Sequence, residues 1–235
     1  MKAGAEEMAK REIILDTETT GLSPIDGHRI VEIGAVELQN QLPTGRVFHA
    51  YLNPEREMPK EAEAIHGLSA AFLRDKPNFK LISKEFLDFV AEDVLVIHNA
   101  SFDMAFINSE LGYCGIAMIP PDRVIDTLLL ARKAHPMGPN SLDALCKRYG
   151  VDNSRRTKHG ALLDAELLAE VYLHLTGGRQ TILGLQQVPV AKDNFQIARM
   201  NIERPRPLQP RLSIAEIQAH AAAVSTLGEK NLWNE

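Results

Sequence analysis

The feature that most constrains the fold is a run of three strand-like segments near the start of the chain. They are rich in β-branched and apolar residues and span 12–17, 29–38 and 46–52, with turn-like stretches at 21–27 and 40–45 between them. Three strands in direct succession predict an antiparallel meander. Helical and strand patterns then alternate, with strands expected at 94–98 and 124–126 and helices at 79–92, 101–112, 127–134, 141–149 and 161–175. We therefore expect a mixed α/β fold in which helices pack on a central sheet.

The composition changes at Gly177-Gly178, which predicts a division of the chain into three parts. Residues 178–212 contain several prolines and little periodic pattern, which is typical of a linker. Residues 213–227 then predict a helix, because Ser213 and Glu216 fit a capping box and one stripe is apolar: Ile214, Ile217, Ala221 and Val224. Such a helix buries its stripe against a partner protein or against its own domain. We thus expect a core domain over 1–177, a linker over 178–212 and a docking segment over 213–235.

Composition and charge exclude several classes of protein. With 45% hydrophobic and 24% charged residues the chain is an ordinary globular one, and neither a membrane span nor a signal peptide is expected. Two cysteines, Cys114 and Cys146, cannot form a disulfide framework or a zinc site, which favours a cytoplasmic protein with reduced thiols. Residues 1–177 hold 19 basic and 26 acidic residues, a net charge of −7. Action on nucleic acid would therefore require metal ions, a local basic patch or a partner.

Two carboxylates lie at the end of the first predicted strand, in the segment DTETTG over 16–21. Asp16 and Glu18 are two residues apart, so they share one face of the strand. Their mutual repulsion would be relieved by a divalent cation, and Mg²⁺ or Mn²⁺ prefers such oxygen ligands. Two solvated acids near a turn are the alternative, which the preceding Ile-Ile-Leu disfavours because it indicates a buried strand.

Two further segments, HNASFD over 98–103 and HGALLD over 159–164, carry similar chemistry. Asp103 and Asp164 each fall in the first turn of a predicted helix, where free backbone N–H groups favour a carboxylate. Gly160 allows His159 to lie on the loop before the second helix and to reach the same cleft. Each acid alone is more often a surface or capping residue, but four carboxylates and one histidine in three spaced segments seldom arise by chance.

In this order the three motifs resemble those of the DEDDh 3′–5′ exonucleases, whose fold is ribonuclease H-like. The histidine five positions before the last aspartate is typical of the His-type branch, since the other branch has a tyrosine where this chain has Gly160. Residues 140–178 also resemble, almost residue for residue, the proofreading epsilon subunits of bacterial DNA polymerase III. The similarity runs from about residue 11 to 178, weakens in the linker and returns at the C-terminal helix and Leu232-Trp233.

The resemblance implies hydrolysis of a phosphodiester by two divalent cations, Mg²⁺ or Mn²⁺. Asp16 would bridge both ions, Glu18 and Asp164 would hold the ion that binds the attacking water, and Asp103 would act on the second ion through water. His159 would be the general base, a role that its ordinary pKa of about 6.5 suits near neutral pH. A loop histidine that only bonds backbone is the alternative.

The resemblance also implies a substrate, a single-stranded or frayed 3′ end of DNA that is released as 5′-mononucleotides. The positions expected at the terminal nucleotide are Asp16, Glu18, Thr19, Thr20, Glu61, His66 and Asp164. Arg155, Arg156 and Lys158 precede His159 and either supply a local positive field or form a solvated charged loop.

The expected partners are other replication proteins, in the cytoplasm at the nucleoid-associated replisome. Residues 180–185, QTILGL, resemble a sliding-clamp-binding peptide that would use Gln180, Leu183 and Leu185, although Leu185 stands where an aromatic residue is common. The segment 213–235 would dock on the polymerase III alpha subunit and so tether the acidic domain near DNA. Whether a small accessory subunit binds the exonuclease domain is left open.

Two other functions remain open at this point. One is a stand-alone RNA-trimming exonuclease of the same superfamily, which the linker and tail disfavour because such chains usually lack both. The other is a scaffold that joins clamp and polymerase with an idle site, which the complete set of ligands and base disfavours.

Overall fold

The computed structural model describes residues 10–156, 158–177 and 213–226. They belong to two units, one within residues 1–185 and one within 186–235, and each is described by itself. The expected linker over 178–212, its clamp-binding peptide at 180–185 and the terminal Leu232-Trp233 lie outside the described residues.

A five-stranded mixed sheet forms the centre of the first unit, with the strand order β3-β2-β1-β4-β5. Its strands are β1 (Arg11–Thr19), β2 (Ile30–Gln39), β3 (Leu42–Tyr51), β4 (Val94–Ile97) and β5 (Val124–Asp126). The first three strands are antiparallel, so the predicted meander is confirmed. β4 runs parallel to β1 and to β5, which brings the carboxyl ends of these three strands to one edge of the sheet.

The hairpin between β2 and β3 is tighter than the sequence suggested. We expected a turn over 40–45, because Asn, Pro, Thr and Gly in this stretch favour turns. Instead, Asn40 and Gln41 form the turn with φ angles of 51° and 65°, the positive values that suit a two-residue hairpin. Pairing resumes with Leu42 opposite Gln39. Pro43 is tolerated in β3 because this is an edge strand of the sheet.

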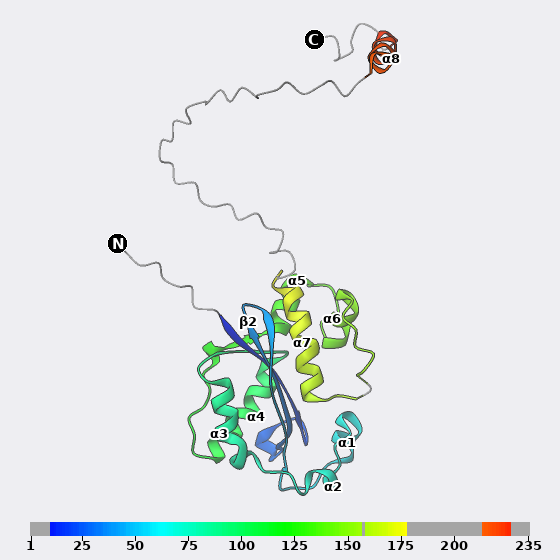
Figure 1. The fold of residues 1–235 in the computed structure, drawn as a ribbon. Helices are drawn as coiled ribbons and strands as arrows, with labels where there is room; N and C mark the ends of the chain where they lie inside the picture. The colour runs from blue at the N-terminus through cyan, green and yellow to red at the C-terminus, as the bar shows by residue number, and fades with distance from the viewer. Residues whose placement is uncertain (1–9, 157, 178–212, 227–235) are drawn as a thin grey trace, which may run out of the picture. The chain divides into compact units, whose positions relative to one another are not determined.

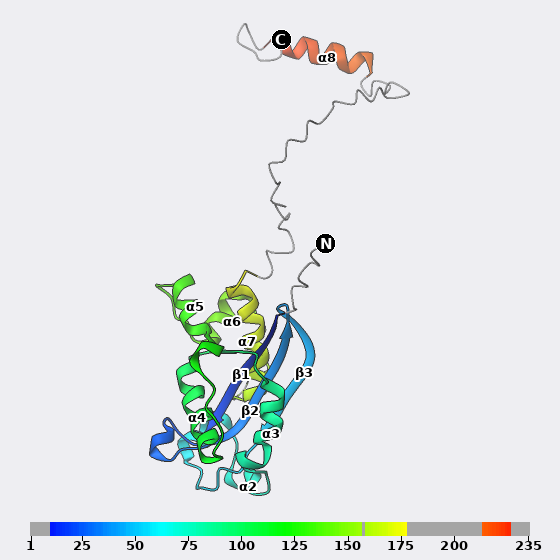
Figure 2. The same cartoon turned by 90° about the vertical axis from the view of Figure 1, so that its left-hand side faces the viewer.

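Helices cover both faces of the sheet, as predicted (Figures 1 and 2). One face carries α3 (Phe79–Val90) and α4 (Ala100–Tyr113), and the other carries α7 (Ala161–Leu175). The helices α5 (Thr127–Ala134) and α6 (Leu142–Tyr149) pack against α7. Alternation along β1 separates the two cores, because Ile13 and Leu15 pack on the α3 and α4 side and Ile14 packs on the α7 side.

The stretch between β3 and α3 carries structure that the sequence did not predict. It contains two short helices, α1 (Lys60–His66) and α2 (Ala70–Leu73). α1 has no side-chain cap at its start and ends at Gly67, whose φ of 79° favours glycine. Two single-turn 3₁₀ helices, η1 (Pro24–Asp26) and η2 (Pro121–Arg123), were also missed.

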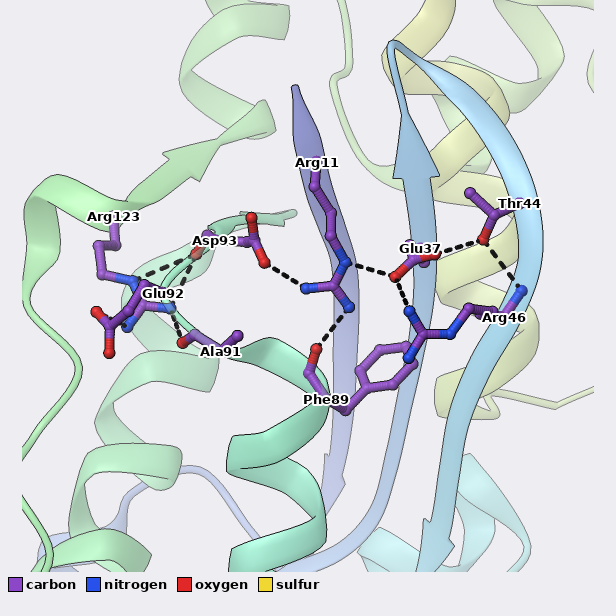
Figure 3. Close-up of polar contacts among 9 residues, drawn as sticks. All are labelled: Arg11, Glu37, Thr44, Arg46, Phe89, Ala91, Glu92, Asp93 and Arg123. Atoms are coloured by element: carbon purple, nitrogen blue, oxygen red, sulfur yellow. Dashed lines mark hydrogen bonds and ion pairs between the residues drawn. The ribbon is translucent and has the colours of Figure 1, made fainter. Parts of the chain in front are cut away.

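An ion-pair network fastens the start of β1 to its neighbours (Figure 3). The guanidinium of Arg11 bonds Glu37 of β2, Asp93 of the loop before β4 and the carbonyl of Phe89 in α3. Arg46 of β3 bonds the same Glu37 carboxylate at 2.8 Å. The network fixes β1 against β2, α3 and the loop before β4, at the end of the strand that is remote from Asp16 and Glu18.

The second unit contains α8 (Ile214–Ser225), which falls inside the predicted helical segment. Both hydrogen bonds of the capping box are present, from Ser213 N to Glu216 Oε2 at 2.7 Å and from Glu216 N to Ser213 Oγ at 3.3 Å. Ile214 and Ile217 are exposed. In the part of the chain that the structure describes, no helix combines the length and apolarity that a membrane crossing requires.

Candidate active site

A cleft of about 760 Å³ brings together the residues of all three motifs. It lies where β1 and β4 reach their carboxyl ends, the edge at which α/β sheets place their ligands. Its lining includes the four carboxylates and the histidine expected from the sequence: Asp16, Glu18, Asp103, His159 and Asp164.

Alternation along β1 directs its side chains to both faces of the sheet. Asp16 and Glu18 point to the α7 side, toward Asp164, whereas Thr17 points to the α4 side. There Thr17 donates two hydrogen bonds to Asp103 Oδ1, from its backbone N at 3.1 Å and from Oγ1 at 2.6 Å. Thr17 thus positions the motif carboxylate of α4, a contact that the sequence analysis missed.

The start of α4 is held by Asp126, a residue that the sequence analysis also missed. Asn99 adopts a left-handed conformation with a φ of 63°, and its backbone N donates to Asp126 Oδ1 at 3.2 Å. The same Asp126 oxygen caps α5 by accepting from Leu128 N at 2.8 Å. One carboxylate therefore fixes the beginnings of both helices and, with them, the position of Asp103.

A close approach of β2 to the first turn of α7 places Asp164. Gly34 of β2 is the Cα partner of Asp16 in β1. A Cβ at Gly34 would lie 2.2 Å from Leu162 N and 2.3 Å from the carbonyl carbon of Ala161. The helix backbone therefore rests on a position where only glycine fits. This contact sets the depth at which Asp164 meets Asp16 across the cleft.

His159 lies on the loop before α7, as expected, and its half-exposed side chain faces the cleft. Its Nδ1 is 3.5 Å from Asp164 Oδ2, and its backbone N donates to the carbonyl of Ile65 at 3.3 Å. Ligand atoms of Glu18, His159 and Asp164 lie within 4.8 Å of one another. The geometry thus gathers these three residues around one small volume.

Burial and mutual repulsion, with burial the larger cause, disfavour the ionised carboxylates of the cluster. Burial, followed by the charges of Asp103, Glu18 and Asp164, raises the pKa of Asp16 well above its usual value. Burial and the charge of Asp164 raise the pKa of Glu18 to about 8. Burial likewise raises the pKa of Asp103 to about 7, although its hydrogen bonds from Thr17 act in the opposite direction.

This repulsion is what a site for divalent cations requires. Four carboxylates converge on one cleft, and their shared negative charge penalises the ionised forms unless positive charge lies between them. Oxygen ligands with one imidazole nearby suit hard cations of the Mg²⁺ and Mn²⁺ type. The residues present therefore fit divalent metal.

A second cavity of about 580 Å³ adjoins the first, with Thr17, Glu18 and Phe102 in the lining of both. Four more of the expected nucleotide contacts line it, namely Thr19, Thr20, Glu61 and His66, whereas Asp16 and Asp164 line the first cleft. His66 Nδ1 accepts a hydrogen bond from Leu68 N at 3.0 Å, and burial lowers the pKa of His66. The unpredicted helix α1 thus delivers Glu61 and His66 to a cavity that shares Glu18 with the carboxylate cleft.

The three basic residues before His159 differ in their exposure and in their contacts. The side chain of Arg156 is largely covered, and it bonds Asp164 through Nε at 2.6 Å and Nη2 at 2.8 Å. Arg155 is exposed and lies 3.8 Å from Glu166, as expected of a solvated charged loop. Lys158 is exposed and lies beside Gly67. Positive charge inside the cleft therefore comes from Arg156 in this segment.

Comparisons with known proteins place the chain in a family. The exonuclease family of RNase T matches residues 13–172. The DNA polymerase III subunit epsilon of Rickettsia prowazekii is 51% identical over 214 residues, which cover 89% of this chain and 93% of the relative. The subunit of the same name from Escherichia coli K12 is 42% identical over 236 residues, with coverages of 95% and 97%. The chain belongs to the DNA polymerase III epsilon family.

Solved structures agree with this family. Exonuclease X in complex with 5′-overhanging duplex DNA has a TM-score of 0.57 at 27% identity, and the match covers 72% of this chain and 93% of that one. The nuclease domain of 3′hExo, described as a DEDDh family member, has a TM-score of 0.63 at 18% identity, with coverages of 74% and 95%, and supports the fold alone. The expected ribonuclease H-like exonuclease fold is thereby confirmed.

Membership of the epsilon family establishes the chain as a proofreading 3′–5′ exonuclease. The family assignment decides against a stand-alone RNA-trimming enzyme and against a scaffold with an idle site. Exonucleases of the DEDDh type generally use divalent metal ions, which agrees with the chemistry of the cleft.

The raised carboxylate pKa values predict how stability depends on pH in the absence of metal. Glu18 and Asp103, with pKa values of about 8 and 7, bind more protons in the native state than when unfolded. Their contribution to stability is present below about pH 4 and is lost as the pH rises to about 8. With chelator, we expect the melting temperature to fall by roughly 5 °C between pH 6 and pH 8.5.

Scanning calorimetry with chelator and with saturating Mg²⁺, at each pH, isolates this effect from other titrating groups. Mg²⁺ should raise the melting temperature more at pH 8.5 than at pH 6. An equal increase at both values would contradict the pKa assignment.

Proposed function

We propose that this chain is the proofreading subunit of the replicative DNA polymerase III of a bacterium, and that it excises mismatched 3′-terminal nucleotides as 5′-mononucleotides. One observation carries the proposal. Carboxylates from β1, α4 and α7 converge with a histidine in a single cleft, in a chain of the epsilon family. The protein would act in the cytoplasm, at the nucleoid-associated replisome.

The carboxylates are proposed to hold two divalent cations, Mg²⁺ or Mn²⁺. Asp16 would contact both, Glu18 and Asp164 would hold the ion next to the attacking water, and Asp103 would act on the other. When bound, the ions lower the pKa of water and stabilise negative charge on the phosphate and the leaving oxygen. Thr17 holds the Asp103 carboxylate through two hydrogen bonds.

His159 is proposed as the general base. Its side chain reaches the cleft from the loop before α7, and Nδ1 lies 3.5 Å from Asp164 Oδ2. A ring nitrogen of a neutral imidazole accepts the proton that the attacking water loses. Its partial exposure allows that proton to pass to solvent afterwards.

The second cavity is proposed to receive the terminal nucleotide. Thr19, Glu61 and His66 line it, and Glu18 belongs to both cavities. A nucleotide in this cavity would lie beside the carboxylate cluster, where Asp16, Glu18 and Asp164 would contact its phosphate through the cations. A mismatched 3′ end frays at lower cost than a paired one, so it enters the cavity more often.

We further propose three parts with separate tasks: an exonuclease domain over 1–177, a linker over 178–212 and a polymerase-docking segment over 213–235. Gln180, Leu183 and Leu185 of the peptide 180–185 would bind the sliding clamp. The docking segment would bind the alpha subunit, so that tethering raises the local concentration of an acidic exonuclease at DNA. A small accessory subunit on the exonuclease domain is a further candidate partner.

The apolar stripe of α8 predicts how docking on the alpha subunit can be broken. Ile217→Glu places a charge on the exposed stripe and is expected to weaken binding at least about tenfold, since burying an unpaired charge is costly. Ala219→Glu changes the opposite side of the same helix and serves as the control. Titration of the alpha subunit with each full-length variant measures the effect. Equal affinities for the two variants would exclude this stripe as the contact.

Excision of mismatched primers tests the proposed function as a whole. The chain is co-purified with the alpha subunit and supplied with paired or mismatched primer–template DNA, with and without Mg²⁺. We expect Mg²⁺-dependent release of 5′-mononucleotides, faster from the mismatched primer. Single-stranded RNA of the same sequence is the comparison substrate, and faster digestion of RNA than of mismatched DNA would contradict the proposal.

A further inference from the structure

Arg156 occupies an unusual position for an arginine, because its side chain is only 8% exposed and lies among the residues of the active site. Nε and Nη2 bond the two oxygens of Asp164 at 2.6 and 2.8 Å, the paired geometry that a guanidinium and a carboxylate favour. Nη2 is also 2.8 Å from His159 Nδ1. One guanidinium thus contacts both catalytic residues of the third motif.

The positive charge of Arg156 also stabilises the negative charge of the other carboxylates on the α7 side. It favours the ionised forms of Asp16 and Glu18, against the repulsion of the other carboxylates. Among the described residues, the other arginine in the lining of this cleft is Arg132, which is exposed. Arg156 therefore supplies inside the cleft the kind of charge that a divalent cation would supply.

Metal binding and the Arg156 contact compete for the same carboxylate. Both oxygens of Asp164 bond the guanidinium, and Asp164 is nearly fully buried. A divalent cation needs at least one of those oxygens at close range, where two positive charges repel each other. The guanidinium has another partner, because Nη1 bonds Asp143 Oδ2 at 2.9 Å at the exposed rim of the cleft.

We propose that Arg156 is an internal counter-cation that neutralises Asp164 while the cleft is free of metal and moves away when divalent cations bind. Asp143 retains the displaced guanidinium at the rim. The segment between α6 and α7 that carries Arg156 has no helix or strand among its described residues, so it accommodates such a movement. The inference rests on the proposed role of Asp164 as a metal ligand.

Two consequences follow from this competition. Without metal, Arg156 holds together a cluster of carboxylates that would otherwise repel one another. With metal, the cost of displacing Arg156 lowers the affinity for the cation. Removal of the guanidinium should therefore weaken the metal-free protein and strengthen metal binding, whereas removal of a merely structural arginine would weaken both.

The test compares Arg156→Gln with Arg155→Gln in the full-length chain. The control removes the same charge from the adjacent residue, whose side chain is 74% exposed and 3.8 Å from Glu166. Calorimetric titration with Mn²⁺ alone measures affinity, and thermal unfolding with chelator and with saturating Mn²⁺ measures stability. For Arg156→Gln we expect Mn²⁺ to bind about tenfold more tightly, with a lowered melting temperature in chelator that Mn²⁺ largely restores.

Arg155→Gln should match the wild type in both measurements. If Arg156→Gln binds Mn²⁺ no more tightly than the wild type, or is equally destabilised with and without Mn²⁺, the inference is wrong. The variant Asp164→Asn tests the proposed metal ligands separately from the displacement of Arg156. Unchanged Mn²⁺ affinity in that variant would overturn the proposed ligand set itself, and the inference with it.

A measurement on the wild-type chain avoids any folding defect of a variant. The Nε–H signal of Arg156 is identified in nitrogen–proton spectra by its absence from Arg156→Lys. Titration with Mg²⁺ should shift or broaden this signal over the concentration range in which the metal binds, because the bond to Asp164 is broken. An Nε–H signal that stays unchanged at saturating Mg²⁺ would show that Arg156 is not displaced.

Discussion

Asp16→Asn should lower the rate of Mg²⁺-dependent digestion of single-stranded DNA by about 10³-fold or more. Asp16 is the carboxylate that the charges of Asp103, Glu18 and Asp164 all influence, so it lies at the centre of the cluster. Loss of its charge removes several kcal/mol of metal-dependent stabilisation of the transition state, and each 1.36 kcal/mol is worth a factor of ten. Single-turnover digestion of a labelled oligonucleotide measures the loss.

Stability distinguishes this loss of chemistry from a loss of fold. Asparagine has nearly the same shape as aspartate and removes one member of a group of repelling carboxylates, so the chelated variant should be as stable as the wild type or more stable. The stabilisation by Mg²⁺ should be largely lost, and binding to the alpha subunit should be retained. Asp122→Asn, which removes an exposed carboxylate from η2, is the control and should digest DNA normally. Full activity of Asp16→Asn would remove the two-metal assignment.

Much of the fold was predictable because its signals are local. The bounds of β5, α5 and α7 agree with those expected, since each begins or ends at a clear change of pattern. The antiparallel meander followed from three strand patterns joined by short turns. The helices α1 and α2 were missed because they are short, and α1 has no side-chain cap that would mark its start.

The residues of the candidate site could be predicted from the sequence. The contacts that hold these residues in place could not. Asp16, Glu18, Asp103, His159 and Asp164 were identified from three motifs, and the structure places all of them in one cleft. The supporting contacts depend on which segments meet in space, and local sequence patterns do not reveal this. Thr17 holding Asp103, Asp126 joining α4 to α5, and Arg156 on Asp164 are long-range or irregular contacts of this kind.

Gly34→Ala should have the second largest effect on exonuclease activity, although Gly34 has no side chain that could take part in the reaction. Its added methyl group would lie 2.2 Å from the backbone of Leu162, and backbone in the first turn of a helix cannot yield as a side chain does. Overpacking of this kind costs about 1–3 kcal/mol of stability. α7 must then move away from β2 and carry Asp164 with it. A displacement of about 1 Å at a catalytic group lowers activity by roughly 100-fold.

Gly112→Ala is the matched control, because nothing lies within 4 Å of its added Cβ in the last turn of α4. The same substitution should there be neutral or stabilising by up to about 1 kcal/mol. Urea unfolding and single-turnover digestion of both variants separate packing from chemistry, and Mn²⁺ titration reports on the ligand set. If Gly34→Ala is destabilised but digests DNA and binds Mn²⁺ as the wild type does, α7 tolerates the movement without displacing Asp164. The depth of this helix on the sheet would then not control the site.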